Sequence, residues 1–405
     1  MPPKNLLPVA DALKRVLDAA SPIADVETIA LREAFGRTLA RDLLATRTQP
    51  PFDVSAMDGY GVRHADISTP GARVKLVGEA AAGRSFPGEV KAGECVRIFT
   101  GAPVPQGADA ILIQEDAIVE GAMIGAREPI RKGQHIRVAG VDFRADEVGL
   151  KAGARLGPAE LALAAAMNHA TVPVTRRPRV ALLSTGSELV EVHERPQGAQ
   201  IRNSNTYSLA GYATKAGAEV VQAGIVVDDF EVTRQAIADA LTQADVVMLS
   251  GGVSMGDYDL VKPALQALGA EILVEKVAMH PGKPTVFARL GEQVIFGLPG
   301  NPVSVAVSFH LFARPVLLKM QGASEIHLPR KRAYVTRQVK GAPPRRSHQP
   351  ARLQLRDGRA KAEPLKWGGS SDLVAFMQAD ALIVVPEDCA SLNAGELAEV
   401  IQLPS

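Results

Sequence analysis

The stretch from Ala244 to Leu265 constrains the fold of this chain more than any other segment. It begins with a short apolar run, Asp245 to Leu249, continues through Ser250-Gly251-Gly252, and ends in a segment with helical apolar spacing. An uninterrupted apolar run of this length is typical of a strand buried on both faces. The order strand, glycine-rich turn, helix therefore predicts a βα unit, in which glycines let the backbone approach a ligand closely.

The same alternation continues on both sides of this unit. It predicts strands at 180–184, 219–226 and 271–274, and helices at 206–216, 232–241 and 259–268. Such alternation indicates a parallel sheet covered by helices. Two more Gly/Pro loops follow, at 281–284 and 297–302, and a buried helix is predicted at 303–318. Loops at the carboxyl ends of parallel strands face one crevice, where open α/β sheets bind ligands.

The turns of this α/β segment collect polar and acidic residues: Thr185, Glu188, Asp228, Ser250, Ser254, Asp257 and Asp259. Carboxylates in such turns suit Mg²⁺, which bridges phosphates and a few protein oxygens. Several acids on one sheet edge also repel one another unless a cation compensates. At this point a plainer account stays open, in which the acids cap helix starts in tight turns.

The remaining segments predict smaller units. Residues 8–20 and 27–43 show helical spacing, the second through Leu31, Phe35, Leu39 and Leu43. Short β-rich runs with Gly, Pro and Asp turns predict one small β domain at 52–140 and another from Arg332 onward. Between them, Pro158 to Met167 predicts a short helix with proline near its first position.

Three loops of the first β region look unusual, around Asp58, Thr100 and the Arg137–Asp142 segment. Ordinary turn chemistry explains each of them taken singly, since Asp-Gly is by itself a strong turn signal. In the second β region, the loop Trp367 to Ser371 is the one suited to a ligand.

Composition excludes several classes of function. The net charge of the 405 residues is +1 and aromatic residues make up 4%, which disfavours a nucleic-acid surface. The two cysteines, Cys95 and Cys389, are far apart in sequence and indicate a reducing, cytoplasmic setting. The sequence has no signal peptide, no transmembrane run, no P-loop and no zinc-type cysteine or histidine spacing.

Six motifs together resemble one family, the molybdopterin molybdenumtransferases, or MoeA family, which is related to the E domains of gephyrin and of plant Cnx1. The motifs are SAMDGYGV (55–62), IFTGAPVPQGADAI (98–111), STGSEL (184–189), SGGVSMGDYD (250–259), PGKP (281–284) and GLPGNPVS (297–304). They occur in the family's order across nearly the whole chain.

The resemblance implies a multidomain α/β protein with four parts. These are an elongated helical dimerisation domain (1–45 and 145–177), an inserted β domain (46–144), a MogA-like three-layer α/β domain that binds molybdopterin (178–327), and a C-terminal β-barrel-like domain (328–405). It also implies a homodimer, with the site in a cleft between the α/β domain of one subunit and the first β domain of the other.

The implied reaction inserts molybdate into adenylylated molybdopterin, releases AMP and forms molybdenum cofactor, with Mg²⁺ as cofactor. The resemblance assigns catalytic or metal roles to Asp228, Asp259, Glu188, Lys276 and Lys283, the three acids being the metal ligands. It assigns substrate binding to Asp58, Thr100, Arg137, Asp142, Ser250, Gly251, Gly252, Ser254, His280, Pro284, Asn301, Ser304 and Ser370. The implied partners are the adenylyltransferase and acceptor molybdoenzymes, with no nucleic acid and no membrane.

Two residues depart from the family pattern. His280 stands where many relatives carry lysine, so anion binding there is expected to depend on pH. Pro350 replaces an arginine in the last domain, where Arg345 or Arg352 is expected to compensate. Two other functions remain as alternatives, a molybdopterin adenylyltransferase and a non-catalytic carrier or scaffold for the cofactor. The sequence does not distinguish molybdate from tungstate as the metal substrate.

Overall fold

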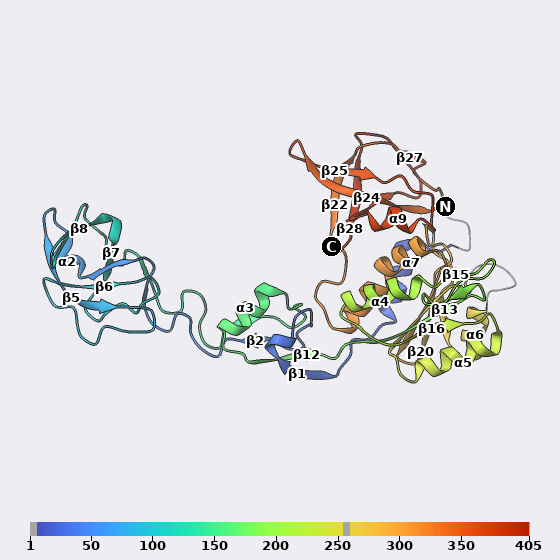
Figure 1. Cartoon of the computed structure of the whole chain (residues 1–405), viewed down its shortest axis with the longest axis horizontal. Helices are drawn as coiled ribbons and strands as arrows, with labels where there is room; N and C mark the ends of the chain where they lie inside the picture. Colours follow the sequence, from blue (N-terminus) through green and yellow to red (C-terminus); the bar gives the residue numbers. More distant parts are fainter. Residues whose placement is uncertain (1–5, 254–259, 405) are drawn as a thin grey trace.

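The computed structural model describes residues 6–253 and 260–404 and shows an elongated chain (Figure 1). A β-rich part lies at one end, and an α/β domain and a C-terminal barrel lie together at the other end. A slender arm joins the two ends, and both marked chain termini lie on the side of the α/β domain and barrel.

The α/β domain is built on a six-stranded sheet in the order β16-β13-β17-β21-β20-β18. Its strands are β13 (Arg179–Thr185), β16 (Glu219–Val226), β17 (Val246–Ser250), β18 (Glu271–Val274), β20 (Val286–Leu290) and β21 (Gln293–Leu298). β13, β16, β17 and β21 are parallel, as the sequence predicts, whereas β20 is antiparallel to both of its neighbours. A small parallel pair, β14 (Leu189–Val190) and β15 (Ile201–Arg202), follows β13.

Helices cover both faces of this sheet, because neighbouring strand residues point to opposite sides. Val180 and Leu182 pack in one core with helices α1 (Val9–Asp18), α4 (Asn205–Lys215), α7 (Pro302–Ser308) and α8 (Arg314–Met320). Ala181 and Leu183 pack in a second core with α5 (Phe230–Leu241) and α6 (Val261–Ala267). The sheet covered by helices that the alternation predicts, and the three-layer domain that the family resemblance implies, are therefore confirmed.

The predicted buried helix at 303–318 is also confirmed, as α7 and α8 joined by a π-helical turn, Phe309–Ala313. The whole segment Pro302–Met320 is long and apolar enough to cross a membrane by length and composition. However, 89% of its most apolar window is buried inside the protein, as expected for a core helix.

The C-terminal part is a small closed barrel. Its strands are β22 (Arg330–Val335), β24 (Arg346–Arg356), β25 (Arg359–Pro364), β26 (Ala381–Val385) and β28 (Leu397–Gln402), and pairing of β24 with β26 closes the ring. The pair β23 (Val339–Lys340) and β27 (Ser391–Leu392) and the helix α9 (Leu373–Met377) flank it. One short strand of the α/β domain, β19 (Met279–His280), pairs with β24 and ties the two parts together.

The distant β-rich part is a second six-stranded sheet, which we call the distal sheet, in the order β7-β4-β6-β5-β9-β8. Its strands are β4 (Gly59–Val62), β5 (Arg73–Ala80), β6 (Glu94–Ile98), β7 (Ala110–Ile113), β8 (Ala117–Glu120) and β9 (Met123–Ala126). The pair β3 (Val54–Ser55) and β10 (Ile136–Arg137), the helix α2 (His64–Ile67) and a 3-10 turn, Gln114–Asp116, accompany it.

The arm consists mainly of strand pairs, so the helix predicted at 27–43 is wrong. β1 (Val26–Ala30) pairs with β12 (Thr171–Thr175), and β2 (Leu43–Leu44) pairs with β11 (Val148–Leu150). The 3-10 turn Leu31–Glu33 follows β1 in this first segment, and α3 (Pro158–Ala166) packs against that turn and β11. Two adjacent β-branched residues, Thr28 and Ile29, favour the strand, and Gly36 with φ of 71° ends the following turn.

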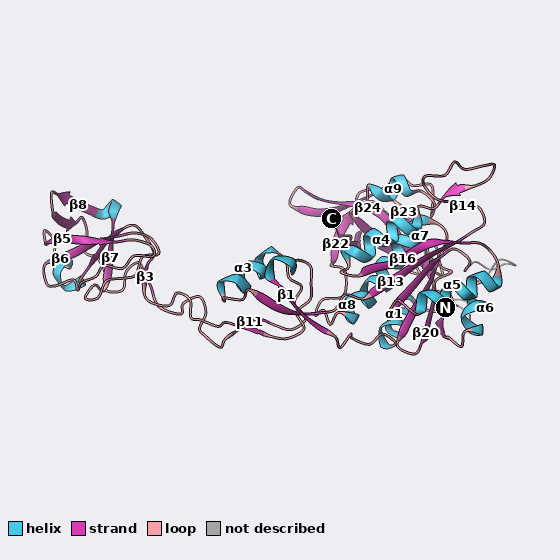
Figure 2. Ribbon diagram, turned by 60° about the horizontal axis from the view of Figure 1, so that its bottom comes forward, coloured by secondary structure: helices cyan, strands magenta, loops and turns pink. Residues whose placement is uncertain are grey.

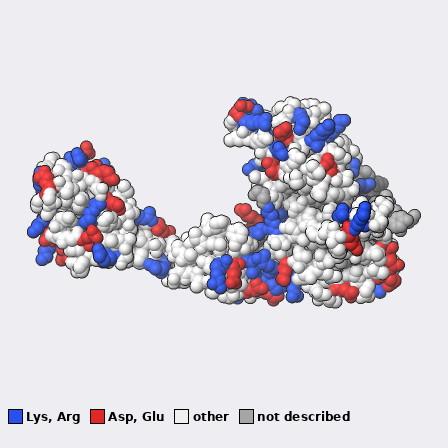
Figure 3. All heavy atoms as spheres, in the orientation of Figure 1, with Lys and Arg blue, Asp and Glu red and all other residues white. Residues whose placement is uncertain are grey.

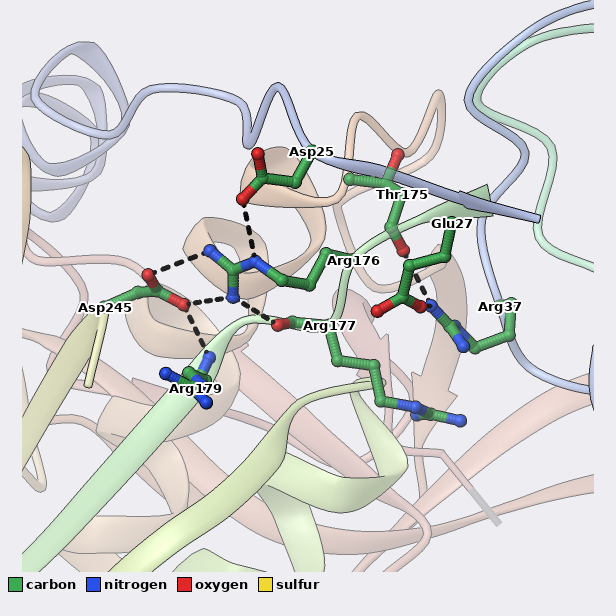
Figure 4. A network of polar contacts seen from close by, with 8 residues as sticks. All are labelled: Asp25, Glu27, Arg37, Thr175, Arg176, Arg177, Arg179 and Asp245. Atoms are coloured by element: carbon green, nitrogen blue, oxygen red, sulfur yellow. Dashed lines mark hydrogen bonds and ion pairs between the residues drawn. The ribbon is translucent and has the colours of Figure 1, made fainter. Parts of the chain in front are cut away.

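Strand pairing also predominates in the arm in the rotated view of Figure 2. Figure 3 shows acidic and basic side chains gathered together where the arm meets the α/β domain. Figure 4 shows the contacts there. Asp245 accepts two hydrogen bonds from the Arg176 guanidinium, at 2.8 and 3.1 Å, and one from the Arg179 backbone N–H, while Arg176 also contacts Asp25. Arg37 pairs with Glu27 beside them.

Candidate functional site

A pocket of about 970 Å³ lies at the carboxyl edge of the α/β sheet; we call it the sheet-edge pocket. It is bounded by the loops that follow β13, β17 and β21, so the sequence-based expectation of one shared crevice is met. Its lining residues are Thr185, Gly186, Glu188, Leu189, Ile201, Arg202, Asn203, Ser204, Asn205, Asp228, Ser250, Gly251, Gly252, Val253, Pro284, Pro299, Gly300, Asn301, Pro302 and Ser371.

The turn after β17 requires glycine for two separate reasons. Gly251 and Gly252 have φ of 93° and 62°, a region that residues with a side chain rarely adopt. A Cβ at Gly251 would lie 2.4 Å from the Thr185 carbonyl oxygen, and one at Gly252 would lie 2.7 Å from the Thr185 hydroxyl. The loops after β13 and β17 are therefore packed backbone to backbone beside the pocket.

A buried network of hydroxyl and amide groups supports the base of these loops. The Ser184 Oγ lies 3.1 Å from the Asn203 Oδ1, 2.9 Å from the Thr206 Oγ1 and 3.1 Å from the Ser250 Oγ. The Asn203 Nδ2 donates to the Thr206 Oγ1 at 2.9 Å. Because these residues come from β13, β17 and the start of α4, the network fixes three segments relative to one another.

Two carboxylates line the pocket, Glu188 and Asp228. The Ser187 backbone N–H donates to the Asp228 carboxylate at 2.8 Å, and the Asp228 N–H donates to the Ser187 hydroxyl at 3.3 Å. The Glu188 carboxylate is folded over Gly186, since a Cβ there would lie 2.7 Å from the Glu188 Oε2. Both residues therefore present oxygen atoms of the kind that Mg²⁺ prefers.

Two predicted residues of this region, Ser254 and Asp259, lie outside the described residues. Within residues 6–253 and 260–404, no three His, Cys, Asp or Glu groups converge as a set that could hold a metal ion. The described part of the pocket thus supplies two of the three expected acidic ligands.

The loop after β21 connects the pocket to the C-terminal barrel. The Asn301 Nδ2 donates to the Ser370 Oγ at 2.8 Å, and the Val303 N–H donates to the Ser370 carbonyl at 3.0 Å. Ser370 thereby presents Ser371 to the pocket, and Ser371 rather than Ser370 is the lining residue. The predicted Ser304 is buried inside α7 and does not line the pocket.

The Pro281–Pro284 loop forms another side of the pocket through Pro284. Lys276 and Lys283 are both half-buried, and Val277, next to Lys276, donates from its N–H to the Lys283 carbonyl at 3.0 Å. His280 is half-buried, and burial together with nearby Arg345 lowers its pKa below the usual value. Neither these lysines nor His280 lines the described cavity.

The residues predicted to contact the substrate from the first β region lie far from this pocket within one chain, since the distal sheet is at the other end of the molecule (Figure 1). There the Asp58 carboxylate accepts hydrogen bonds from the Thr100 backbone N–H and hydroxyl, both at 2.8 Å, which lower the pKa of Asp58. Arg137, on β10, forms an ion pair with Asp142, five residues later in the sequence.

Sequence reasoning missed Asn203 and Asn205 as lining residues, and it chose Ser370 rather than Ser371 within the loop Trp367 to Ser371. Asn205 donates from its Nδ2 to the Gly300 carbonyl at 2.7 Å, which joins the start of α4 to the loop after β21. The run Asn203-Ser204-Asn205 directly before a helix was the available signal, because such residues favour helix starts and turns.

Comparison with protein families gives three matches in order along the chain. Residues 7–168 match the model of the MoeA N-terminal region (domain I and II), residues 181–319 match a probable molybdopterin binding domain, and residues 332–403 match the MoeA C-terminal region (domain IV).

Curated proteins are similar over nearly the same length. The chain is 33% identical to the molybdopterin molybdenumtransferase of Haemophilus influenzae, covering 98% of each chain. It is 36% identical to that of a Nostoc species, covering 94% of this chain and 89% of the relative. Among solved structures, a molybdopterin biosynthesis MoeA protein from Pyrococcus horikoshii OT3 superposes with a TM-score of 0.84 at 30% identity, covering 98% of this chain and 100% of that one.

Proposed function

This chain belongs to the MoeA family of molybdopterin molybdenumtransferases, and on that premise we propose that it inserts molybdate into adenylylated molybdopterin, releasing AMP. The sheet-edge pocket is the observation that carries the proposal. Its volume of about 970 Å³ lies near the upper end of the range for small-molecule sites, about 300–1,000 Å³. A pterin joined to a nucleotide needs a pocket of that size.

In the proposed reaction, water attacks the phosphoanhydride bond between the two halves of the substrate, the bond breaks and AMP leaves. The two dithiolene thiols bind molybdenum through sulfur, and one molybdate oxygen leaves as water with the two thiol protons, so the substrate itself supplies the metal ligands. The protein then has to bind two anions next to each other. Lys276 and Lys283, neighbours across one backbone hydrogen bond, supply positive charge for molybdate.

We assign Glu188 and Asp228 as residues that hold Mg²⁺, because both line the pocket and present carboxylate oxygens. Asp259 is the third acid of the proposed set. When bound, the ion neutralises phosphate charge during cleavage of the phosphoanhydride bond.

The proposal includes a homodimer in which the distal sheet of one copy contributes to the pocket of the other. Asp58, Thr100, Arg137 and Asp142 support this part, because they occupy the family's motif positions yet lie at the far end of their own chain (Figure 1). In this proposal the chain divides into four parts, with boundaries at 45, 145, 178 and 328. The part 46–144 of one subunit completes the pocket of the part 178–327 of the other.

We also place the reaction in the cytoplasm, between an adenylyltransferase that supplies the substrate and molybdoenzymes that accept the product. The two free cysteines, Cys95 and Cys389, are in keeping with that setting.

The proposal is tested by measuring AMP release from adenylylated molybdopterin with Mg²⁺ present, across a molybdate titration. Saturable, molybdate-dependent release is expected from the wild type. The Asp228→Ala variant is expected to fold and to lose at least about 100-fold in turnover, the usual effect of removing an essential electrostatic group. Asp18→Ala is the matched control, since Asp18 is an exposed carboxylate of α1 that pairs with Lys14. AMP release that is independent of molybdate would contradict the proposal.

A further inference from the structure

A chain of hydrogen bonds crosses the contact between the α/β domain and the C-terminal barrel. The indole N–H of Trp367 donates to the Gln349 Oε1 at 2.7 Å. The Gln349 Nε2 donates to the Ser347 Oγ at 2.8 Å, and that oxygen lies 3.3 Å from the His280 Nδ1. The His280 and Trp367 rings also meet edge to face, with centroids 6.1 Å apart. Four side chains from three segments therefore form one connected group.

The hydrogen bonds from Trp367 through Gln349 to Ser347 can run in only one direction. An indole N–H can only donate, so the amide oxygen of Gln349 faces Trp367 and its NH₂ faces Ser347. The Ser347 oxygen accepts from Gln349, and its hydroxyl proton can be donated to the His280 Nδ1. Such a bond needs a neutral imidazole, and burial and Arg345 both lower the pKa of His280 and so favour the neutral form.

Each end of this hydrogen-bonded group, His280 and Trp367, adjoins a loop of the sheet-edge pocket. His280 directly precedes Pro281–Pro284, whose Pro284 lines the pocket, and His280 pairs with Ser347 in the β19–β24 register. This loop is tightly held, because the Thr285 hydroxyl donates to the Gly282 carbonyl at 2.8 Å.

The loop at the other end begins at Trp367 and supplies Ser371 to the pocket. Its shape is fixed by Asp372, which accepts from the Gly368 N–H at 2.8 Å and from the Ala375 N–H at 3.0 Å. Ser370 of the same loop holds Asn301 on the opposite wall. Both loops are held by internal hydrogen bonds, and the side chains that join them contribute to their relative placement.

We propose that Gln349 is a positioning residue that holds these two pocket loops, 281–284 and 368–371, at the distance required for substrate binding. Gln349 is the side chain that contacts both Trp367 and Ser347, and it belongs to β24, a strand of the barrel. The C-terminal barrel thus has a direct part in the site. The Gln349 side-chain amide fixes the relative position of the two pocket loops. Loss of that amide is expected to weaken substrate binding more than it lowers turnover.

The test uses Gln349→Met, which keeps the length of the side chain and removes its hydrogen bonds to Trp367, to Ser347 and, at 3.3 Å, to the Lys340 carbonyl. Gln354→Met is the matched control, on the same strand toward the β24–β25 hairpin. Trp367 is the only tryptophan of the chain, so its fluorescence reports on the network without labelling. Because the inference rests on the proposed function for the identity of the ligand, binding is measured with AMP alone by calorimetry, separately from turnover.

In Gln349→Met we expect a shifted Trp367 emission maximum, AMP binding weakened about tenfold, and a KM for adenylylated molybdopterin raised about tenfold with kcat changed less than about threefold. Gln354→Met is expected to match the wild type in all four. Ser347→Ala removes the hydroxyl that links Gln349 to His280 but leaves the hydrogen bond between Trp367 and Gln349. It should give a smaller loss of AMP affinity with unchanged Trp367 emission. The Gln349→Met/Trp367→Phe double variant should bind AMP no more weakly than the worse single variant.

Equal AMP affinity in Gln349→Met and Gln354→Met would overturn the inference, as would a loss confined to kcat. If Gln349→Met does not fold, unchanged AMP affinity in both Ser347→Ala and Trp367→Phe would overturn it equally. A wild type that binds AMP but releases none with molybdate would refute the proposed function alone. A wild type that binds no AMP would remove the nucleotide site on which both rest.

Discussion

Acidification from pH 7.5 to pH 5 is expected to destabilise this protein through two histidines that the fold buries as neutral groups. His310, in the π-helical turn, and His348, on β24, are 6% and 1% exposed, and the Nδ1 of each has no hydrogen-bond partner. Burial is the main cause that lowers the pKa of each to about 3, with Arg314 contributing at His310 and Arg346 at His348.

The size of the effect follows from proton linkage. Above about pH 6.5 each histidine is neutral in both the native and the unfolded states, so it has no influence on stability. Below that pH the unfolded state binds a proton that the native state does not, and stability falls until the pH reaches the native pKa near 3. At pH 5 the loss is about 2 kcal/mol per histidine, or roughly 4 kcal/mol for both.

The assay is urea unfolding followed by circular dichroism at both pH values. His310→Phe removes one titrating group and places an apolar ring between Tyr212 and Phe309, whose ring centroids lie 4.9 and 5.7 Å from that of His310. This variant should lose only about half as much stability on acidification as the wild type. Substitution of the exposed His193 by alanine should change nothing. An acid loss in His310→Phe as large as in the wild type would refute the reasoning.

Three further predictions follow from the pocket, the joint with the arm and the proposed dimer. Gly251→Ala should abolish AMP binding with the fold retained. The φ of Gly251 is 93°, and the new Cβ would lie 2.4 Å from the Thr185 carbonyl oxygen at the end of β13. Wild-type AMP affinity in calorimetry would contradict this prediction. Asp245→Asn should lower stability by roughly 2 kcal/mol by weakening the charged hydrogen bonds from Arg176, with KM unchanged, as thermal melting and kinetics would show. Mixing Asp58→Ala with Asp228→Ala chains should restore about a quarter of wild-type turnover if each dimeric pocket draws on both copies, and no recovery would exclude that arrangement.

The α/β domain could be predicted from the sequence because its signals are local. The apolar runs at 180–184 and 245–249 are each long enough for a strand buried on both faces, and each is followed at once by a turn containing glycine. β20 was not foreseen as antiparallel, because a hairpin return to β21 depends on a short turn around Gly291 and not on a periodic pattern.

The arm could not be predicted correctly, because its structure depends on partners distant in sequence. The spacing of Leu31, Phe35 and Leu39 imitates a helix, yet Phe35 is 63% exposed and Leu39 is buried against residues of the second arm segment. β1 finds its partner in Thr171–Thr175, about 145 residues later, and that pairing outweighs local helical propensity. The residues of either arm segment alone therefore do not reveal that the two segments pair as strands.

The pocket residues could likewise be predicted only where the local sequence carries a signal. Glu188, Asp228 and Gly251 were identified because strand-end turns concentrate chemistry, whereas Gln349 gave no local signal at all. A glutamine in a β-rich run is ordinary until the fold places an indole on one side of it and a serine on the other. Residues of this kind are found only once the barrel is assembled.

One sheet carries the sheet-edge pocket at its carboxyl edge and the joint to the arm at its amino edge, where Asp245 and Arg179 begin their strands (Figure 4). The arm therefore leaves from the side opposite to the pocket and carries the distal sheet away from it. The pKa of Asp58, in the loop before β4 of the distal sheet, is lowered by hydrogen bonds from Thr100, which favours its charged form there. The proposed dimer would place this charged loop beside the pocket of a second copy, and the mixed-chain experiment decides whether the site is assembled in that way.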